Sequence, residues 1–203
     1  YLFQKKFLLE MLNASRAPDF GGQIIPEAIQ HGKVSVYPFN GYWVDVGTIG
    51  AFFNANLDFT APLPKFDFYI EEARVYTRPR FLPPTKLTDC KVSRSILGEG
   101  SVIQQADIED SVIGLRYVIQ GVGQIRQSIL MGNDYYERQY DTGFIRPMIG
   151  PHVIIERAIV DKNVIIGEGS EIRGSEKLFD RDSTKYYIRD GIVVIPANTV
   201  IPP

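Results

Sequence analysis

The sequence has little that would place it in a membrane, in an oxidised compartment or on nucleic acid. Its 203 residues include one cysteine, Cys90, which excludes an intramolecular disulfide framework and fits a reducing compartment. No apolar run reaches the roughly 18 residues that a membrane-spanning helix needs. The 22 basic and 24 acidic side chains give a net charge of −2, whereas nucleic-acid-binding proteins usually carry a basic stripe. We therefore expect neither a membrane nor a nucleic acid as a partner.

The start of the sequence also lacks two common features. Residue 1 is Tyr rather than Met, and no apolar signal-peptide segment follows it. A length of 203 residues allows one or two domains with a buried core. We interpret the sequence as a piece of a longer chain.

Residues 1–60 alternate helical patterns with turns. Apolar residues at helical spacing predict one helix around 7–12, a second at 24–29 and a third at 49–57. Val34, Val36 and Tyr37 predict a short strand between the second and third helices. Residues 61–84 contain five prolines, which cannot donate backbone hydrogen bonds and favour extended chain. This proline-rich connector marks the expected domain boundary.

Residues 85–173 carry an internal repeat. Aliphatic residues recur every six positions at Ile96, Val102 and Ile108, and again at Val153, Ile159 and Ile165. A period of six is neither helical nor that of an alternating strand, and it fits a β-helix built of hexapeptides. Gly, Asn and Asp between the aliphatic residues tolerate the positive φ of tight corners. Segments 134–148 and 174–185 lack the period and should loop out, and 186–195 should form a turn into the strand that closes the stack.

Five strings occur in an order that points to one family. They are GYWVDVGT at 41–48, RFLPPTK at 80–86, LMGNDYY at 130–136, AIVDKN at 158–163 and YIRDGI at 187–192. Together they resemble glucose-1-phosphate adenylyltransferase, also called ADP-glucose pyrophosphorylase. The resemblance implies a mainly β fold. A left-handed parallel β-helix for regulation and oligomerisation would cover 85–203, with the C-terminal remnant of a mixed α/β nucleotidyltransferase domain at 1–60 and the connector at 61–84.

The resemblance also implies a reaction. ATP and glucose 1-phosphate would give ADP-glucose and pyrophosphate in glycogen or starch synthesis, in a bacterial cytoplasm or a plastid stroma. The family's glycine-rich phosphate loop and its sugar-phosphate lysine have no counterpart in this sequence. We therefore expect the 203 residues to be inactive alone. The β-helix would join subunits into a homo- or heterotetramer.

The resemblance assigns catalytic and substrate-binding roles to four residues. Asp45 in the WVDVGT string would be the catalytic ligand of Mg²⁺, an ion that prefers carboxylate, phosphate and water oxygens. Trp43, Gln4 and Asp19 would lie at the substrates, although Gln4 is not the family's usual residue at its position. The alternatives are a turn aspartate before a helix for Asp45 and a helix-breaking turn for Asp19.

Basic residues of the repeat region are candidates for a regulatory site. The resemblance assigns anionic effectors, such as sugar phosphates, phosphoglycerate or phosphate, to Lys162, Arg116 and Arg80. The alternative is a set of solvated charges at β-helix corners. Many relatives carry a second effector lysine where this sequence has Ala197, so we expect a weaker or altered effector response.

Other functions stay open at this point. The alternatives are a non-catalytic assembly module and a transferase of another sugar, such as mannose-1-phosphate guanylyltransferase. Hexapeptide acyltransferases use a histidine base, for which His152 is the candidate, although its Gly-Pro-His context favours a surface turn. The aromatic residues between 37 and 69 could stack on a base, but a packing seam between domain and β-helix is favoured.

Overall fold

The structure of the chain is a computed structural model that describes residues 1–14, 19–32, 34–121, 123–137 and 146–203. The chain divides into two compact units, Tyr1–Gly41 and Tyr42–Pro203, and each is described by itself. Among the described residues, no helix is long and apolar enough to cross a membrane.

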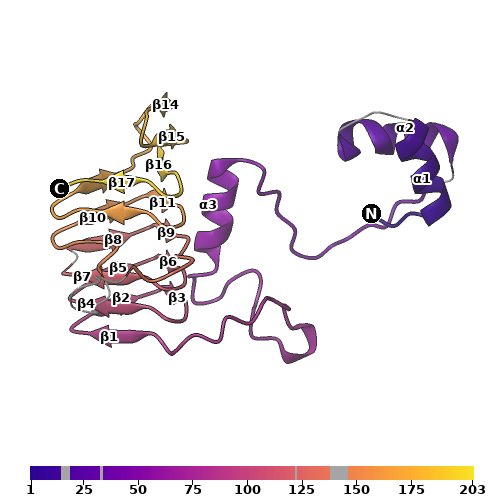
Figure 1. Ribbon diagram of the computed structural model, residues 1–203. Coiled ribbons are helices and arrows are strands. Elements are labelled where there is room, and N and C mark those ends of the chain that lie inside the picture. Colours follow the sequence, from indigo (N-terminus) through magenta and orange to yellow (C-terminus); the bar gives the residue numbers. More distant parts are fainter. Residues whose placement is uncertain (15–18, 33, 122, 138–145) are drawn as a thin grey trace. The chain divides into compact units, whose positions relative to one another are not determined.

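The described part of the first unit is helical (Figure 1). Helix α1 covers Lys5–Ala14, the short π-helix η1 covers Phe20–Ile24 and α2 covers Ile25–His31. The helices predicted around 7–12 and 24–29 are thereby confirmed. Ile24 and Ala28 are buried, as the apolar spacing of the second helix requires.

The strand predicted at 34–37 is wrong. None of the described residues between 34 and 46 belongs to a strand. The side chains of Val36 and Tyr37 are 89% and 87% exposed. A strand needs a hydrogen-bonded neighbour, and the described residues of the first unit provide none. β-branched and aromatic residues at alternating positions are therefore not sufficient to form a strand here.

The second unit opens with helix α3, which covers Ile49–Asp58 as predicted. Thr48 is its N-cap, and the Thr48 Oγ1 accepts a hydrogen bond from the Ala51 N–H at 3.2 Å. A single 3₁₀ turn, η2, covers Glu71–Ala73 in the connector.

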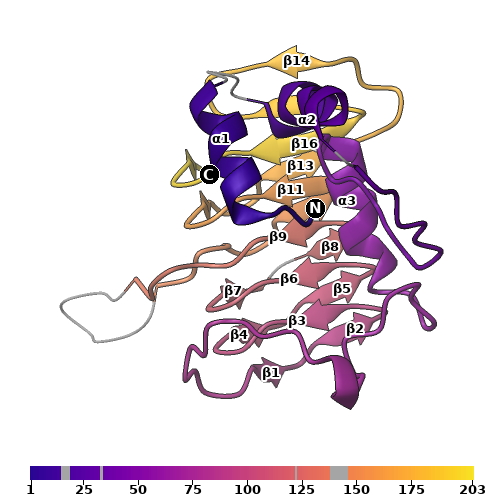
Figure 2. The same ribbon diagram turned by 90° about the vertical axis from the view of Figure 1, so that its right-hand side faces the viewer.

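From residue 86 onward the chain winds into stacked coils whose short strands form parallel sheets (Figures 1 and 2). The first face holds β1 (Lys86–Thr88), β4 (Val102–Gln104), β7 (Val118–Gln120), β12 (Ile165–Ile166) and β17 (Val200–Ile201). The second holds β2 (Lys91–Ser93), β5 (Asp107–Glu109), β8 (Gln124–Arg126), β10 (Ile154–Glu156) and β13 (Glu171–Arg173). The third holds β3 (Ile96–Leu97), β6 (Val112–Ile113), β9 (Ile129–Leu130), β11 (Ala158–Val160) and β16 (Ile192–Ile195). This arrangement is the parallel β-helix predicted from the six-residue period.

Inward-facing aliphatic side chains hold the coils together. In the middle coils of the first and second faces the central residue of each three-residue strand points into the interior, and Ile103, Ile119, Ile108 and Ile125 are fully buried. The register places Ile103 beside Ile119 and Ile108 beside Ile125. Like side chains therefore stack in columns, and each coil buries the apolar surface of its neighbours.

The corners between strands use a left-handed backbone. Seven corner residues of two adjacent columns have φ between 42° and 57°: Asp89, Gln105, His152, Arg94, Asp110, Gln127 and Arg157. The prediction that Gly, Asn and Asp fill the corners is therefore correct only in part. Arg, Gln and His adopt the same conformation because the repeated coil geometry imposes it on them.

A column of serines, which the sequence analysis missed, satisfies backbone groups near one corner. The Oγ atoms of Ser95, Ser111 and Ser128 each accept a hydrogen bond of 3.2 Å from the backbone N–H of the equivalent residue one coil further on. The last of these donors belongs to Ala158. The serines recur at the coil length, so their spacing was visible in the sequence.

Two excursions leave the stack. Residues 138–145 of the first one lie outside the described residues, and Ile149 re-enters the stack as a bridge between Ile119 and Ile166. The second excursion contains β14 (Arg181–Asp182), which pairs antiparallel with β15 (Tyr187–Arg189). β15 in turn runs antiparallel to β16. The turn into a strand predicted at 186–195 is thus a hairpin whose second strand, β16, joins the coils, and β17 follows it.

Helix α3 lies along the third face of the β-helix (Figure 2). Its buried Phe53 packs against Ile129, Ile159 and Ile192 of that face. The Arg157 guanidinium lies over the Phe53 ring at 5.7 Å from the centroid. At α3, the expected aromatic packing seam on the β-helix is present.

Candidate functional site

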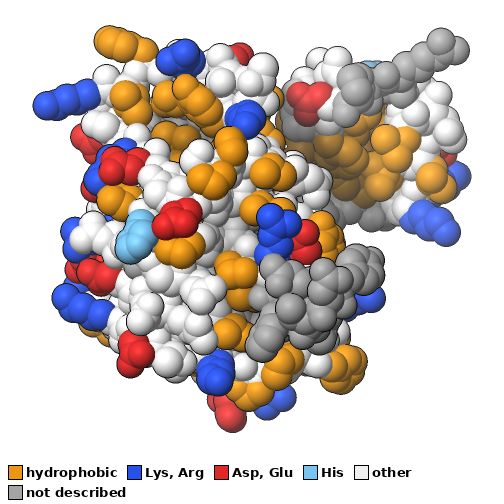
Figure 3. Space-filling model, turned by 60° about the vertical axis from the view of Figure 1, so that its left-hand side comes forward, with side chains coloured by type: hydrophobic (Ala, Val, Ile, Leu, Met, Phe, Trp, Pro, Cys, Tyr) orange, Lys and Arg blue, Asp and Glu red, His pale blue; other side chains and the backbone are white. Residues whose placement is uncertain are grey.

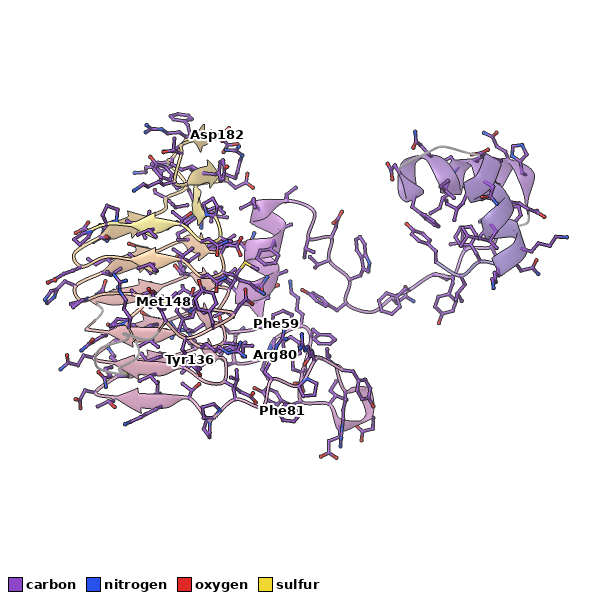
Figure 4. The ribbon with its side chains drawn as sticks, in the orientation of Figure 1. Phe59, Arg80, Phe81, Tyr136, Met148 and Asp182 are labelled. Carbon is purple, nitrogen blue, oxygen red and sulfur yellow. The ribbon has the colours of Figure 1, made fainter. Side chains whose placement is uncertain are left out.

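A hollow of about 630 Å³ lies at one corner of the β-helix and gathers basic side chains. It is lined by Arg78, Pro79, Arg80, Phe81, Leu115, Arg116, Met131, Asn133, Asp134 and Lys162. The three residues predicted to bind effectors are therefore brought together. Arg80 and Phe81 come from the connector, just before β1 (Figure 4). We call this hollow the basic pocket.

Coil geometry explains why residues far apart in sequence meet here. The register aligns Ile113, Leu130, Val160 and Ile195 at the ends of β6, β9, β11 and β16. The third residue after each of these ends falls in one corner column, which contains Arg116, Asn133, Asn163 and Asn198. Lys162 directly precedes one of these corner residues, as Leu115 precedes another. The pocket is thus built by repetition of one corner.

Asn133 joins two corners of the basic pocket and is almost completely buried, with 3% exposure. Its Nδ2 donates to the Arg116 carbonyl at 3.3 Å, and its Oδ1 accepts from the Asn163 N–H at 3.1 Å. The Arg116 Nη1 donates back to the Asn133 carbonyl at 3.2 Å. Asn133 therefore fixes the Arg116 turn against the turn that carries Lys162.

Lys162 faces an acidic partner in the same pocket. Its Nζ lies 3.2 Å from the Asp134 Oδ1. The Asn163 Nδ2 donates to the Asp134 Oδ2 at 3.1 Å, and the Asp134 N–H donates to the Asn163 Oδ1 at 2.8 Å. Hydrogen bonds from Asn163 and from Lys162 hold the pKa of the Asp134 carboxyl below its usual range. Asp134 is therefore ionised at every pH at which Lys162 could bind a charged phosphate.

Asp45 and Trp43 occupy an exposed loop before α3 and do not line the basic pocket. The Asp45 Oδ1 accepts a hydrogen bond from the Gly47 N–H at 2.9 Å, which makes a tight Asx turn. Thr48 then caps α3. The turn that was the alternative interpretation of Asp45 is therefore present. The Asp45 side chain is also exposed to solvent. Trp43 is 74% exposed.

Gln4 and Asp19 belong to the first unit. Gln4 is exposed and directly precedes α1. Asp19 caps η1, since its Oδ1 accepts from the Gly21 N–H at 2.9 Å while its own N–H donates to the Gln23 Oε1 at 3.2 Å. The cap accounts for Asp19 structurally, and the substrate contact predicted for each residue stays a prediction.

Comparison with protein families follows the same division of the chain. Residues 80–203 match the family model of the GLGC left-handed parallel beta-helix domain, and residues 1–61 match that of the nucleotidyl transferase domain. The chain belongs to the GLGC β-helix family. The hand of the coils is therefore left, as the resemblance implied. The two matches together make it a sugar-phosphate nucleotidyltransferase of the GLGC type.

The GLGC β-helix places Ala197 next to Lys162. The register aligns Val160 with Ile195, so Lys162 and Ala197 hold the same corner position in neighbouring coils. The Asn198 N–H donates to the Lys162 carbonyl at 2.9 Å. Ala197 is exposed, so a longer side chain there would extend beside Lys162.

His152, considered above as a candidate base, and the single cysteine, Cys90, have structural roles in the β-helix. His152 is an exposed corner residue with φ 57°, as expected for a surface turn. The Cys90 thiol is partly buried and donates to the carbonyls of Thr88 and Ile103 at 3.2 and 3.4 Å.

Sequence reasoning missed three residues of the basic pocket: Arg78, Asn133 and Asp134. Arg78 stands two residues before Arg80 in an extended segment, a spacing that puts both side chains on one side. Asn133 and Asp134 lie in one of the strings that carried the resemblance, where position alone indicated no role.

Proposed function

We propose that the chain is part of a glucose-1-phosphate adenylyltransferase, which makes ADP-glucose and pyrophosphate from ATP and glucose 1-phosphate. The observation that carries the proposal is the GLGC β-helix match over residues 80–203, beside a nucleotidyl transferase match over 1–61. Two of the five strings, AIVDKN and RFLPPTK, favour ADP-glucose over a product with another sugar or base.

In this proposal Asp45 provides one ligand of Mg²⁺. The fit rests on chemistry, since Asp45 presents an exposed carboxylate and Mg²⁺ is often held by one or two carboxylates together with phosphates and water. The described residues contain no group of three or more His, Cys, Asp or Glu placed to hold a metal. A bound Mg²⁺ neutralises charge on the phosphates.

The chain's own contribution is to hold Asp45 in place. Gly47 fixes the Asp45 carboxylate through the Asx turn, and Thr48 begins α3 immediately afterwards. Phe53 anchors α3 on the β-helix. The loop is therefore supported by a rigid element rather than by a free linker.

An Asp45→Asn substitution in the enzyme that contains this chain tests the catalytic part of the proposal. We expect kcat for pyrophosphate release to fall by about 100-fold or more, with a raised requirement for Mg²⁺, because one anionic ligand is lost. Asp58→Asn, at the other end of α3, is the matched control and should leave kcat unchanged. An unchanged kcat in Asp45→Asn would remove Asp45 from the catalytic machinery.

We further propose that the basic pocket binds a phosphorylated effector. Arg78, Arg80, Arg116 and Lys162 provide four cations around one hollow, and guanidinium and ammonium groups are suited to phosphate. Calorimetric titration with fructose 1,6-bisphosphate measures this directly. Lys162→Ala should weaken binding about tenfold, while Lys177→Ala, in the excursion before β14, should leave it unchanged. Equal affinities of wild type and Lys162→Ala would contradict the assignment.

Assembly is the second candidate function, and a GLGC-type β-helix favours it. We propose a homo- or heterotetramer held by β-helix contacts. Light scattering of the 203-residue chain distinguishes a tetramer from a monomer. A monomer at micromolar concentration would contradict the proposal. Acetyl-coenzyme A binding would instead support an acyltransferase.

A further inference from the structure

We propose that Asp134 is an internal counter-ion of the basic pocket, which occupies Lys162 until an incoming phosphoryl group displaces it. The inference rests on the effector site proposed above and concerns its regulation. Asp134 would set the concentration at which an effector begins to bind, because the anion must compete with a carboxylate that is already in place.

The first observation is that Asp134 is held beside Lys162 by more than the ion pair. Its backbone N–H and its Oδ2 both bond to the Asn163 side chain, at 2.8 and 3.1 Å. The Lys162 Nζ contacts the other oxygen, Oδ1, at 3.2 Å. Lys162 has a long side chain that is 47% exposed and free to turn, whereas two bonds fix Asp134. The carboxylate therefore stays near the pocket when the lysine turns to another anion.

The second observation is that the following segment is fastened to the same corner of the β-helix. The Tyr136 hydroxyl donates to the Gly100 carbonyl at 2.6 Å (Figure 4). Gly100 follows Leu97 by three residues, as Arg116 follows Ile113, so it belongs to the corner column of the pocket. The next residue, Glu137, pairs with Arg146 at 3.2 Å. Residues 134–137 are thus fastened at several points, which keeps Asp134 at its position.

The third observation concerns charge. Among the described residues lining the basic pocket, Asp134 is the one acidic side chain, beside Arg78, Arg80, Arg116 and Lys162. Elsewhere on the β-helix, basic and acidic side chains are interspersed, as Figure 3 shows for one face. A phosphoryl group that reaches Lys162 lies within a few ångströms of Asp134. Repulsion at that distance in a water-exposed site corresponds to about fivefold in affinity per unit charge.

The test is calorimetric titration of the wild-type chain, Asp134→Asn and Lys162→Ala with fructose 1,6-bisphosphate. Asn keeps the shape and the hydrogen bonds to Asn163 but removes the charge. We expect Asp134→Asn to bind about fivefold tighter than the wild type, with a smaller dependence of affinity on salt. Asp182→Asn is the matched control: it removes the same charge from an exposed ion pair with Arg189 on the β14–β15 hairpin, and should leave affinity unchanged (Figure 4).

The outcomes separate this inference from the effector site. If Lys162→Ala weakens binding while Asp134→Asn binds with wild-type or lower affinity, the site stands and the counter-ion role is wrong. Binding by Asp134→Asn where the wild type shows none supports the inference most strongly. If neither the wild type nor Asp134→Asn binds fructose 1,6-bisphosphate, both the effector site and the counter-ion inference are wrong. Asp134→Ser, assayed in the same way with its thermal unfolding recorded, replaces Asp134→Asn should that variant not fold.

Discussion

At the residue scale, paired charges line the second face of the β-helix. The Arg94 guanidinium donates to Asp110 at 2.6 and 2.9 Å and to Glu109 at 2.6 Å. The hydrogen bonds from Arg94 hold the pKa of the Asp110 carboxyl below its usual range. Three coils further along, Arg173 pairs with Glu156 of the preceding coil and with Glu171 of its own strand. These pairs join neighbouring coils across their exposed edges.

The lowered pKa of Asp110 predicts an acid-dependent loss of stability. A carboxyl whose pKa is lower in the folded chain stabilises it above the usual aspartate pKa, and this stabilisation disappears as pH falls through the folded value. Wild type should therefore melt above Asp110→Asn at pH 7, and the two melting temperatures should converge on acidification. Thermal unfolding from pH 7 to pH 2 measures the difference. A difference that stays constant over this range would contradict the pairing.

Ala197 supports a second prediction at this scale. Ala197→Lys places an ammonium group one coil from Lys162, where a second cation would face the same anion. We expect fructose 1,6-bisphosphate to bind about fivefold tighter to Ala197→Lys. Ala197→Gln, of similar length but neutral, is the control in the calorimetric comparison. Equal affinities for the Lys and Gln variants would show that position 197 does not reach the ligand.

Individual residues show how far sequence reasoning reaches into the site. Lys162, Arg116 and Arg80 could be nominated because charged residues in recognisable strings are visible one at a time. Asp134 and Asn133 could not, because their roles arise only when coils 17 to 30 residues apart come into register. Arg94 and Asp110 illustrate the same limit, since their pairing depends on a corner conformation that no single residue encodes.

At the scale of elements, tight glycine contacts set the spacing of the coils. A Cβ added at Gly114 would lie 2.6 Å from the Gly132 nitrogen and from the Met131 carbonyl, and both are backbone atoms that cannot move aside. A Cβ added at Gly123 would meet its nearest atom, the Val153 carbonyl oxygen, at 3.4 Å. A Cβ therefore fits at position 123 but not at position 114.

Gly114→Ala is expected to lower the free energy of unfolding by about 1–3 kcal/mol, the usual cost of overpacking. Gly123→Ala, the matched control, should stay within about 0.5 kcal/mol of the wild type. Urea unfolding followed by circular dichroism measures both. Equal losses in the two variants would contradict the close approach of coils at Gly114.

The attachment of α3 offers another prediction. The Asp190 carboxylate, from the turn between β15 and β16, accepts a hydrogen bond of 3.2 Å from the Gly50 N–H in the first turn of α3. A carboxylate there satisfies a free donor and complements the helix dipole. Asp190→Ala should lower the free energy of unfolding by about 1 kcal/mol and speed amide hydrogen exchange in α3. Unchanged exchange in α3 would show that the cap is dispensable.

Elements also differ in how well their sequences predict them. The β-helix was visible because its period repeats over many coils, and α3 because Thr48 caps a run of apolar residues. The strand at 34–37 failed because a strand depends on a partner that local sequence does not reveal. For 186–195 the prediction of a turn into a strand agrees with β16, whereas the antiparallel pairing of β15 with β14 and β16 was not predicted because it depends on a partner strand outside the segment.

At the scale of the molecule, the second unit holds α3, the loop of Asp45 and the basic pocket on one β-helical stack. The third face of the β-helix holds α3 and the loop of Asp45, while one of its corners forms the basic pocket. Shared coils connect these places, since Ile129 under α3 and Leu130 before the pocket are neighbours in β9. In the proposed function, an effector bound at this corner contacts the same stack that supports the loop of Asp45.

The central claim is that this stack belongs to an enzyme that joins ATP to glucose 1-phosphate. Its most direct test is pyrophosphate release by the enzyme containing this chain, with ATP and glucose 1-phosphate compared with GTP and mannose 1-phosphate. We predict release with the first pair and none above background with the second. The 203 residues alone should release none with either pair. Turnover with GTP and mannose 1-phosphate in place of the first pair would contradict the claim.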